Sequence, residues 1–437
     1  MADFTRTESD LRHNVNINLN VRGLPQSATL AINELSKRLQ AEGRTVYKLG
    51  LGQSPFPVPA EVVAALKENA HQKDYLPVGG LPALKEAVAE RHRRRESIDY
   101  RHEDVLIGPG SKELMFLVQL VYYGDLVIPV PSWVSYAPQA RIIGRHIHWL
   151  DTHHGNDLHL TPDVFERLCA QDPECPRLII LNYPNNPSGT TYSVDELKAI
   201  AAVARKYRVI LISDEIYGDL HHQGKHVSIA RFYPEGTIIS SGLSKWCGAG
   251  GWRLGTFVFP RALHWLREAM AVVASETFTA TSAPIQYAAV TAFRGSPAID
   301  HYLVLSRRIL KALGNHCARK LQRAGAVVPR PRGGFYLFAN FNAFRTELRR
   351  RGIYTSQQFC DTLLEETGVA VLPGSAFGLH REELSTRLSY VDFDGAAALA
   401  AAEAIRPDQS LDTAFLKRHC APVVTAIDRL VGWVGNL

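Results

Sequence analysis

A lysine set among small residues carries the strongest chemical signal in this sequence. Lys245 lies in residues 241–255, Ser-Gly-Leu-Ser-Lys-Trp-Cys-Gly-Ala-Gly-Gly-Trp-Arg-Leu-Gly, shortly after the β-branched run at residues 237–239. Glycines let other backbone approach closely, and a primary amine on a flexible stem can form a covalent imine with an aldehyde cofactor. Arg253 offers a permanent positive charge of the kind that binds such a cofactor's phosphate. Taken alone, the segment also fits a surface Ser-Lys turn.

The elements that must position this lysine follow a regular pattern. Between residues 60 and 260, short β-branched runs alternate with helical patterns, which predicts a mostly parallel sheet between helices. The seven strand candidates are residues 105–107, 126–128, 146–149, 177–181, 209–212, 237–239 and 256–259.

Unusual residues follow five of these predicted strands. They are residues 108–111, 131–133, 182–189, 214–217 and Lys245, after the first, second, fourth, fifth and sixth strands. In open parallel sheets, ligands bind outside the carboxyl ends of the strands. The sequence therefore predicts one ligand site assembled from segments more than a hundred residues apart.

The rest of the chain predicts an arm and a second, smaller α+β domain. Residues 1–24 are polar and irregular, and residues 27–39 have apolar spacing typical of a helix that ends near Gly43. A long helix at 299–324 precedes strands at 333–338, 369–372 and 387–391, a helix at 357–367 and a helical C-terminus. We expect an arm (1–24), a large cofactor-binding domain (60–310) and a small domain (25–59 with 311–437).

The length and composition of the chain limit the class of protein to which it can belong. The chain has 437 residues, 46% hydrophobic and 21% charged, with a net charge of +6, which fits a globular protein of two domains. The basic run at 91–95 fits a solvated helix end better than a nucleic-acid patch, since no aromatic residues interleave with it.

Cysteine and histidine patterns predict neither disulfides nor a metal site. The six cysteines are dispersed, and the histidine groups at 146/148, 153/154 and 221/222/226 lack ligands at convincing spacing. No signal peptide or membrane-spanning run is evident, so we expect a cytoplasmic chain without membrane or nucleic-acid partners.

Taken in order, these motifs resemble the pyridoxal-phosphate aminotransferases of classes I and II, the fold-type I group, from about Ser27 to the C-terminus. The resemblance implies that Lys245 is the Schiff-base lysine and that Asp214 pairs with the pyridine nitrogen of the cofactor. It implies that Tyr217 and Asn186 hydrogen-bond the ring's 3′ oxygen and that Trp133 stacks on the ring. From the residues alone, Asp214 also fits a helix cap, Asn186 a turn residue and Trp133 core packing.

The resemblance also implies a phosphate site shared between two subunits. Gly110, Ser111 and Lys112 open a predicted helix whose backbone N–H groups suit a phosphate, and Arg253 adds a cation. Tyr75 resembles the tyrosine that reaches the phosphate of the neighbouring subunit, which implies a homodimer. Many members of the family have a phosphate-binding serine where this chain has Gly242, and either Ser241 or Ser244 could replace it.

For the substrate, Arg387 resembles the arginine that binds the α-carboxylate, and Gly52 the glycine whose backbone meets the same group. Asn186 and Trp133 also face the substrate in the family. Lys112, Ser27 and Thr29 resemble residues of the prokaryotic aspartate aminotransferase subgroup that meet a distal carboxylate, although Lys112 also fits a solvated surface lysine.

We therefore expect a ping-pong aminotransferase that uses aspartate or glutamate/2-oxoglutarate as one pair. Alternatives are an aminotransferase for aromatic or other neutral amino acids, and a lyase, cyclase or oxidase on the same fold. A sensor domain of a transcription regulator is disfavoured, because only about two dozen residues precede Ser27.

Overall fold

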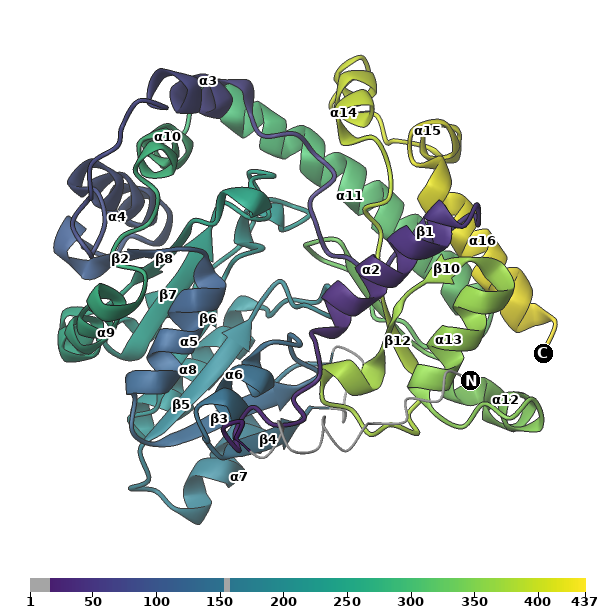
Figure 1. Ribbon diagram of the computed structural model, residues 1–437, viewed down its shortest axis with the longest axis horizontal. Coiled ribbons are helices and arrows are strands. Elements are labelled where there is room, and N and C mark those ends of the chain that lie inside the picture. The colour runs from purple at the N-terminus through teal and green to yellow at the C-terminus, as the bar shows by residue number, and fades with distance from the viewer. Residues whose placement is uncertain (1–15, 153–157) are drawn as a thin grey trace.

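A seven-stranded sheet forms the centre of the larger part of the molecule. The computed structural model describes residues 16–152 and 158–437, and its main sheet has the order β2-β8-β7-β6-β5-β3-β4 (Figure 1). The strands are β2 (Val105–Gly108), β3 (Asp125–Val130), β4 (Ile147–Asp151), β5 (Arg177–Asn182), β6 (Ile210–Asp214), β7 (Thr237–Gly242) and β8 (Gly255–Val258). Only β8 runs antiparallel to its neighbours, β7 and β2. All seven strand candidates and the mostly parallel α/β fold are confirmed.

The sheet is buried because helices cover both of its faces. Every residue of β5 and of β6 is buried, as expected for parallel strands with apolar layers on both sides. Leu178 and Ile180 pack with α5 (Ser111–Val121), α6 (Tyr136–Ile142) and α9 (His264–Thr277) on one face. Ile179 and Leu181 alternate with them and pack with α7 (Pro162–Gln171) and α8 (Val194–Lys206) on the other face.

Three more helices pack together at the β2 edge of this part. They are α3 (Ala60–Glu68), α4 (Pro82–Glu96) and α10 (Ala283–Arg294), and α10 contacts both of the others (Figure 1). Short 3-10 turns connect the strands, among them η2 (Gly218–Leu220) after β6 and η5 (Gly250–Trp252) before β8.

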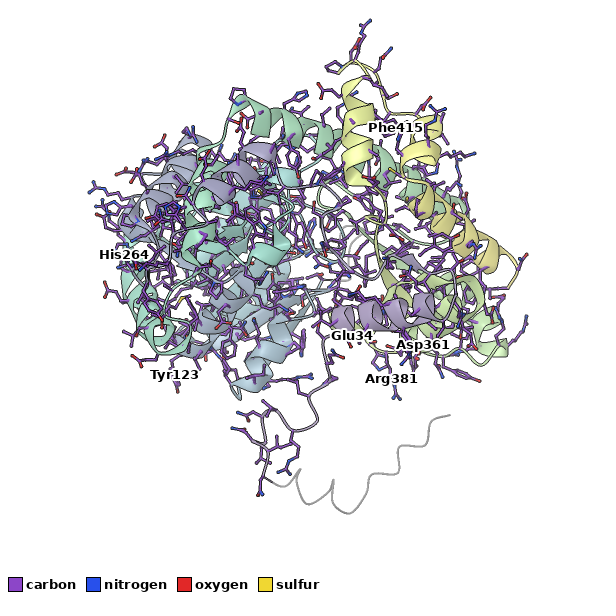
Figure 2. All side chains as sticks on the ribbon, turned by 45° about the horizontal axis from the view of Figure 1, so that its top comes forward. Glu34, Tyr123, His264, Asp361, Arg381 and Phe415 are labelled. Carbon is purple, nitrogen blue, oxygen red and sulfur yellow. The ribbon has the colours of Figure 1, made fainter. Side chains whose placement is uncertain are left out.

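The smaller part combines the N-terminal helix with the C-terminal third of the chain. Here β1 (Tyr47–Lys48) pairs in parallel with β10 (Val369–Ala370), while β11 (Leu372–Pro373), β12 (Ser385–Ser389) and β9 (Tyr336–Asn340) form an antiparallel sheet. The helices of this part are α2 (Ala28–Ala41), α12 (Arg345–Arg350), α13 (Ser356–Thr367), α14 (Gly395–Glu403), α15 (Thr413–His419) and α16 (Ala421–Gly435). In Figure 2, Tyr123 and His264 mark the main-sheet part, whereas Glu34, Asp361 and Arg381 mark the smaller one.

Several boundaries differ from the sequence expectation. The predicted strand at 369–372 is two short strands, β10 and β11, in different sheets, and the strand predicted at 387–391 is β12, at 385–389. The predicted strand at 333–338 begins later, at Tyr336, because Gly334 takes a left-handed turn with φ of 61°. The predicted domain boundary at residue 310 falls inside α11 (Pro297–Arg323), one continuous helix of 27 residues, so this division stays a prediction. Of the predicted arm, residues 1–15 lie outside the described residues.

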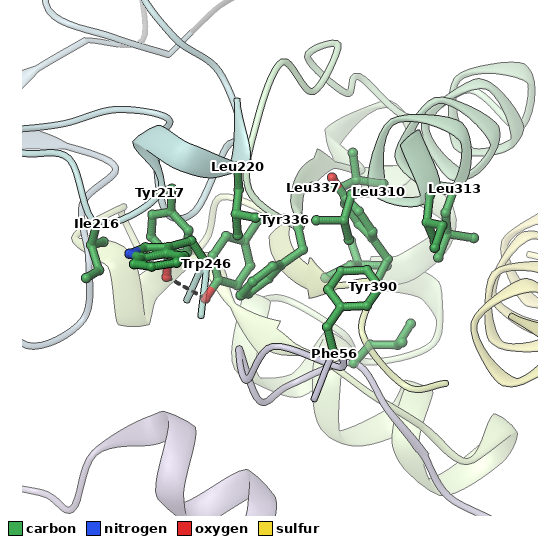
Figure 3. Packing of buried hydrophobic residues seen from close by; sticks show 14 of the residues in the cluster. Phe56, Ile216, Tyr217, Leu220, Trp246, Leu310, Leu313, Tyr336, Leu337 and Tyr390 are labelled. Carbon is green, nitrogen blue, oxygen red and sulfur yellow. Dashed lines mark hydrogen bonds between the residues drawn. The ribbon is translucent and has the colours of Figure 1, made fainter. Parts of the chain in front are cut away.

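One apolar cluster joins the two parts of the molecule. Tyr217 and Trp246, from the main-sheet side, share it with Leu310 of α11 and with Tyr336 and Tyr390 of the smaller part (Figure 3). The hydroxyls of Tyr217 and Tyr336 lie 2.9 Å apart, within hydrogen-bonding distance. Within the described ranges, no helix is long and apolar enough to cross a membrane.

Candidate active site

A cavity of about 560 Å³ lies where the carboxyl ends of the main strands face the smaller part. This volume is within the range of small-molecule sites. Most of the residues singled out from the sequence line it: Ser27, Thr29, Gly52, Ser111, Lys112, Trp133, Asn186, Asp214, Tyr217, Ser244, Lys245, Arg253 and Arg387. Gly110, Ser241 and Tyr75 are not among its lining residues.

Lys245 follows β7 and extends its amine into this cavity, where Nζ donates to the carbonyl of Gly52 at 2.8 Å. Burial, followed by the charges of Arg387 and Arg253, lowers the pKa of Lys245 to about 8. Burial penalises the ammonium form, and nearby cations add to that penalty. The amine is thus easier to deprotonate than an ordinary lysine.

Asp214 ends β6 and is buried at the floor of the same cavity. Burial raises the pKa of Asp214 to about 6, although the hydrogen bond from Tyr136 acts in the opposite direction. Tyr136 Oη donates to Asp214 Oδ2 at 2.5 Å. This carboxylate is therefore positioned by a phenol that the sequence reasoning missed.

Tyr136 also supports the aromatic wall of the cavity. Trp133 packs edge-to-face against Tyr136, with ring centroids 5.2 Å apart. The sequence signal for the contact between these two rings is their spacing: Tyr136, the first residue of α6, lies three residues after Trp133. A carboxylate partner 78 residues away is not visible in that spacing.

Arg387 projects from the central strand of the small sheet and is 1% exposed. Its Cζ lies 4.7 Å from the ring centroid of Tyr336 and 5.1 Å from the ring centroid of Phe377. It donates to Asn186 Oδ1 at 3.2 Å and to the carbonyl of Gly50, while its Nε has no partner among the described residues. A buried guanidinium that lines a cavity is suited to a carboxylate ligand.

Close packing explains the glycine at position 52. A Cβ on Gly52 would lie 1.9 Å from the hydroxyl of Tyr336, which lines the cavity and which the sequence reasoning also missed. The same hydroxyl contacts Tyr217, so Gly52, Tyr217 and Tyr336 form one tightly packed wall.

The predicted phosphate end is built around the start of α5. Gly110 precedes the helix with φ of 95°, and a Cβ there would lie 2.2 Å from an Arg253 nitrogen. Glycine therefore allows the guanidinium to lie against the helix N-terminus. Arg253 donates to the carbonyls of Gly250 and Pro109 at 2.9 and 3.3 Å. Free N–H groups of the first helical turn and a fixed cation together favour an anion here.

The backbone also accounts for the departure at position 242. A Cβ on Gly242 would lie 2.6 Å from the carbonyl oxygen of Leu254 on the neighbouring segment. Of the two serines that could replace a phosphate-binding serine, Ser244 lines the cavity. Ser241 instead lines a separate small pocket together with Arg95.

The remaining predicted residues lie at the rim or away from the cavity. Lys112 is exposed, and its Nζ lies 5.2 Å from the ring of Trp133. Ser27 and Thr29, at the start of α2, face the same cavity. Tyr75 is 91% exposed, in the loop between α3 and α4, and does not reach this cavity within one chain.

The histidine groups form no metal centre in the part of the chain that the structure describes. His226 Nε2 contacts the Glu215 carboxylate at 2.8 Å, and His222 contacts the carbonyl of Gly334. His153 and His154 lie outside the described residues.

Comparison with known proteins agrees with this geometry. The family model for aminotransferase class I and II matches residues 44–405. An aspartate aminotransferase of Geobacillus stearothermophilus is 36% identical over 380 residues, which cover 85% of this chain and 93% of that relative. An asparagine–oxo-acid transaminase of Streptococcus mutans is 31% identical, over 84% of this chain and 92% of the relative.

Solved structures give the same result. The structure of aspartate aminotransferase from Thermus thermophilus with maleate superposes with a TM-score of 0.80 at 26% identity, covering 95% of this chain and 99% of that one. These relatives are transaminases, so the lyase, cyclase and oxidase alternatives find no support here. The chain belongs to the class I and II aminotransferases and is a pyridoxal-phosphate-dependent transaminase.

Proposed function

We propose that this transaminase exchanges an amino group between L-aspartate or L-glutamate and a 2-oxo acid, by a ping-pong mechanism, as a cytoplasmic homodimer. The observation that carries the substrate proposal is the placement of two cations in one cavity. Arg387 is buried at one wall and Lys112 lies on the rim, so a substrate with two carboxylates can contact both. The names of the known relatives, several of them aspartate aminotransferases, support the same choice.

The residues present fit pyridoxal phosphate. The N-terminus of α5, Arg253 and Ser244 would hold the phosphate, since glycine at position 110 lets the Arg253 guanidinium lie against the start of the helix. Asp214, whose buried carboxyl accepts a hydrogen bond from a phenol at 2.5 Å, would face the ring nitrogen. When bound, the cofactor supplies an aldehyde and a ring that accepts electrons from the substrate Cα.

The ring would be held by three further side chains. Asn186 and Tyr217 would contact its 3′ oxygen, and Trp133 would lie on its face. Asn186 is fixed for this role, because its backbone N–H donates to Asn182 Oδ1 at 2.7 Å and its side chain accepts from Arg387.

Lys245 would attach the cofactor and, once released, move the substrate Cα proton. An amine with a pKa of about 8 has a substantial neutral fraction near physiological pH, as a general base requires. Asp214 stays anionic above its own pKa of about 6 and would keep the ring nitrogen protonated.

Loss of the Arg387 guanidinium is expected to weaken turnover strongly. A charge-assisted hydrogen bond contributes about 1.5–3 kcal/mol, so two bonds to a carboxylate correspond to a fall of about 10²–10⁴ in kcat/KM. We expect this fall for aspartate and glutamate in Arg387→Ala, measured in a coupled steady-state assay. Arg350→Ala, on the exposed end of α12, is the matched control. Retained cofactor absorbance in the variant shows that the fold is intact, and a change below about threefold would contradict the assignment.

Lys112 is expected to select for the distal carboxylate. Lys112→Ala should lower kcat/KM for aspartate and glutamate by about tenfold or more, because one charge-assisted contact is lost. Alanine and phenylalanine have no second carboxylate, so their kcat/KM should stay within about twofold. Stopped-flow absorbance against this panel measures each half-reaction. An equal fall for all four amino acids, or a wild-type preference for the neutral ones, would rule out the dicarboxylate proposal.

The low pKa of Lys245 predicts a pH-dependent rate of cofactor uptake. Only the neutral amine is nucleophilic, so the apoprotein should take up pyridoxal phosphate faster as pH rises through about 8. Since Arg387 lowers this pKa, Arg387→Ala should move the midpoint to higher pH. Absorbance after rapid mixing follows the uptake. A midpoint that stays in place in the variant would show that the two groups are not coupled.

Tyr75 is expected to act across a dimer interface. We expect Tyr75→Phe to weaken cofactor retention by about tenfold, because one hydrogen bond to the charged phosphate of the neighbouring subunit is lost. Tyr123→Phe is the matched control, because Tyr123 is 96% exposed and does not line the cavity. Equilibrium dialysis gives the retention and sedimentation velocity the oligomeric state. A monomeric active species would refute the shared site.

A further inference from the structure

A second cavity, of about 550 Å³, lies away from the catalytic residues. One wall is the middle and the C-terminal part of α11, with Arg308, Lys311, Asn315, His316 and Arg319. The other wall is residues 407–413 and Leu416, at the start of α15. A smaller hollow lined by Asn315, Arg319 and Arg330 continues it along the helix. We call this feature the α11 groove. Figure 1 shows α11 beside α15, and Figure 2 labels Phe415 of α15.

The groove holds cations that no described neighbour neutralises. Lys311 and Arg319 are exposed and form neither an ion pair nor a hydrogen bond with a described residue. They stand on one face of α11 with Asn315 between them, about 12 Å apart along the axis at about 1.5 Å per residue. Their long side chains can converge on one ligand.

The acidic side chains of the opposite wall are already engaged. Asp408 accepts two hydrogen bonds from Arg406, at 3.1 and 2.7 Å. Asp412 caps α15, with Oδ1 accepting from the backbone N–H of Phe415 at 2.8 Å. Three permanent cations, Arg308, Lys311 and Arg319, line the groove against these two carboxylates, so its net charge is positive.

The walls are held in place without help from a ligand. Arg308 donates to four backbone carbonyls, those of Ala402, Ile405, Arg406 and Gln409, and so fixes the 402–409 segment against α11. At the base, His316 is buried and its Nε2 has no partner among the described residues. A buried polar atom without a partner costs free energy, which a bound polar group offsets.

We propose that the α11 groove is a second, non-catalytic binding site for a small organic or inorganic anion that carries two or more phosphate or carboxylate groups. Lys311 and Arg319 supply the charge, Asn315 a neutral donor, and Ala312, Pro407 and Leu411 the apolar part of the wall. The volume of the groove matches that of sites for such molecules. The wall at 407–416 lies after the stretch that the family model matches, so the catalytic assignment does not account for it.

Calorimetric titration of the cofactor-saturated protein tests this proposal. Pyrophosphate and citrate are the probes, one for phosphate and one for carboxylate ligands. We expect saturable binding of at least one probe to the wild type, and a Kd about tenfold higher or more in Lys311→Gln/Arg319→Gln. Steady-state transaminase activity of the groove variant checks that it is folded.

Two further variants distinguish binding in the groove from a nonspecific effect of net charge and from binding in the catalytic cavity. Arg323→Gln/Arg350→Gln removes the same net charge from exposed positions outside the groove and should leave Kd within about twofold. Arg387→Ala weakens carboxylate binding in the catalytic cavity. A probe that binds in the groove should therefore still bind to this variant. No saturable binding to the wild type, unchanged Kd in the groove variant, equal weakening in the charge control, or loss of binding in Arg387→Ala would each overturn the proposal.

Discussion

The structure depends on one buried guanidinium, that of Arg387, which hydrogen-bonds to two segments far from it in the sequence. Arg387 on β12 donates to Gly50 in the N-terminal segment and to Asn186 in the loop after β5, partners separated from it by 337 and 201 residues. Since a buried charge is costly unless it is hydrogen-bonded, these contacts fix the smaller part relative to the main sheet. Arg387 also lines the cavity, so the residue that holds these segments together is the one proposed to bind a substrate carboxylate.

Burial and nearby charges give Asp214 and Lys245 different protonation states at the same pH. Burial moves the pKa of Asp214 up to about 6 and that of Lys245 down to about 8. Between these values the carboxylate is ionised while part of the lysine is neutral, which is the combination that a transaminase requires. The two groups reach these states because both are buried and because Arg387 and Arg253 add positive charge near the amine.

Crowding around the backbone explains why positions 52, 110 and 242 are glycine. Position 242 accepts only glycine in this conformation, since a Cβ would meet the carbonyl oxygen of Leu254. Ser244 is therefore the serine at the cavity, two residues further along the chain. At Gly110 and Gly52 the neighbour is a side chain that lines the cavity, Arg253 or Tyr336, and the missing Cβ leaves room for that side chain.

The strands, and the edge of the sheet at which the site forms, follow from the amino-acid sequence alone. Buried parallel strands such as β5 and β6 are continuous apolar runs, and the residues after them must gather at one edge, so Asp214, Asn186 and Lys245 can be grouped from their positions in the chain. Which side chains then meet one another is a property of the folded molecule. Tyr136 on Asp214, Tyr336 against Tyr217 and the α11 groove join residues whose separation leaves no periodic or local signal. Long-range contacts depend on the packing of whole elements, and that packing is fixed only when the chain is folded.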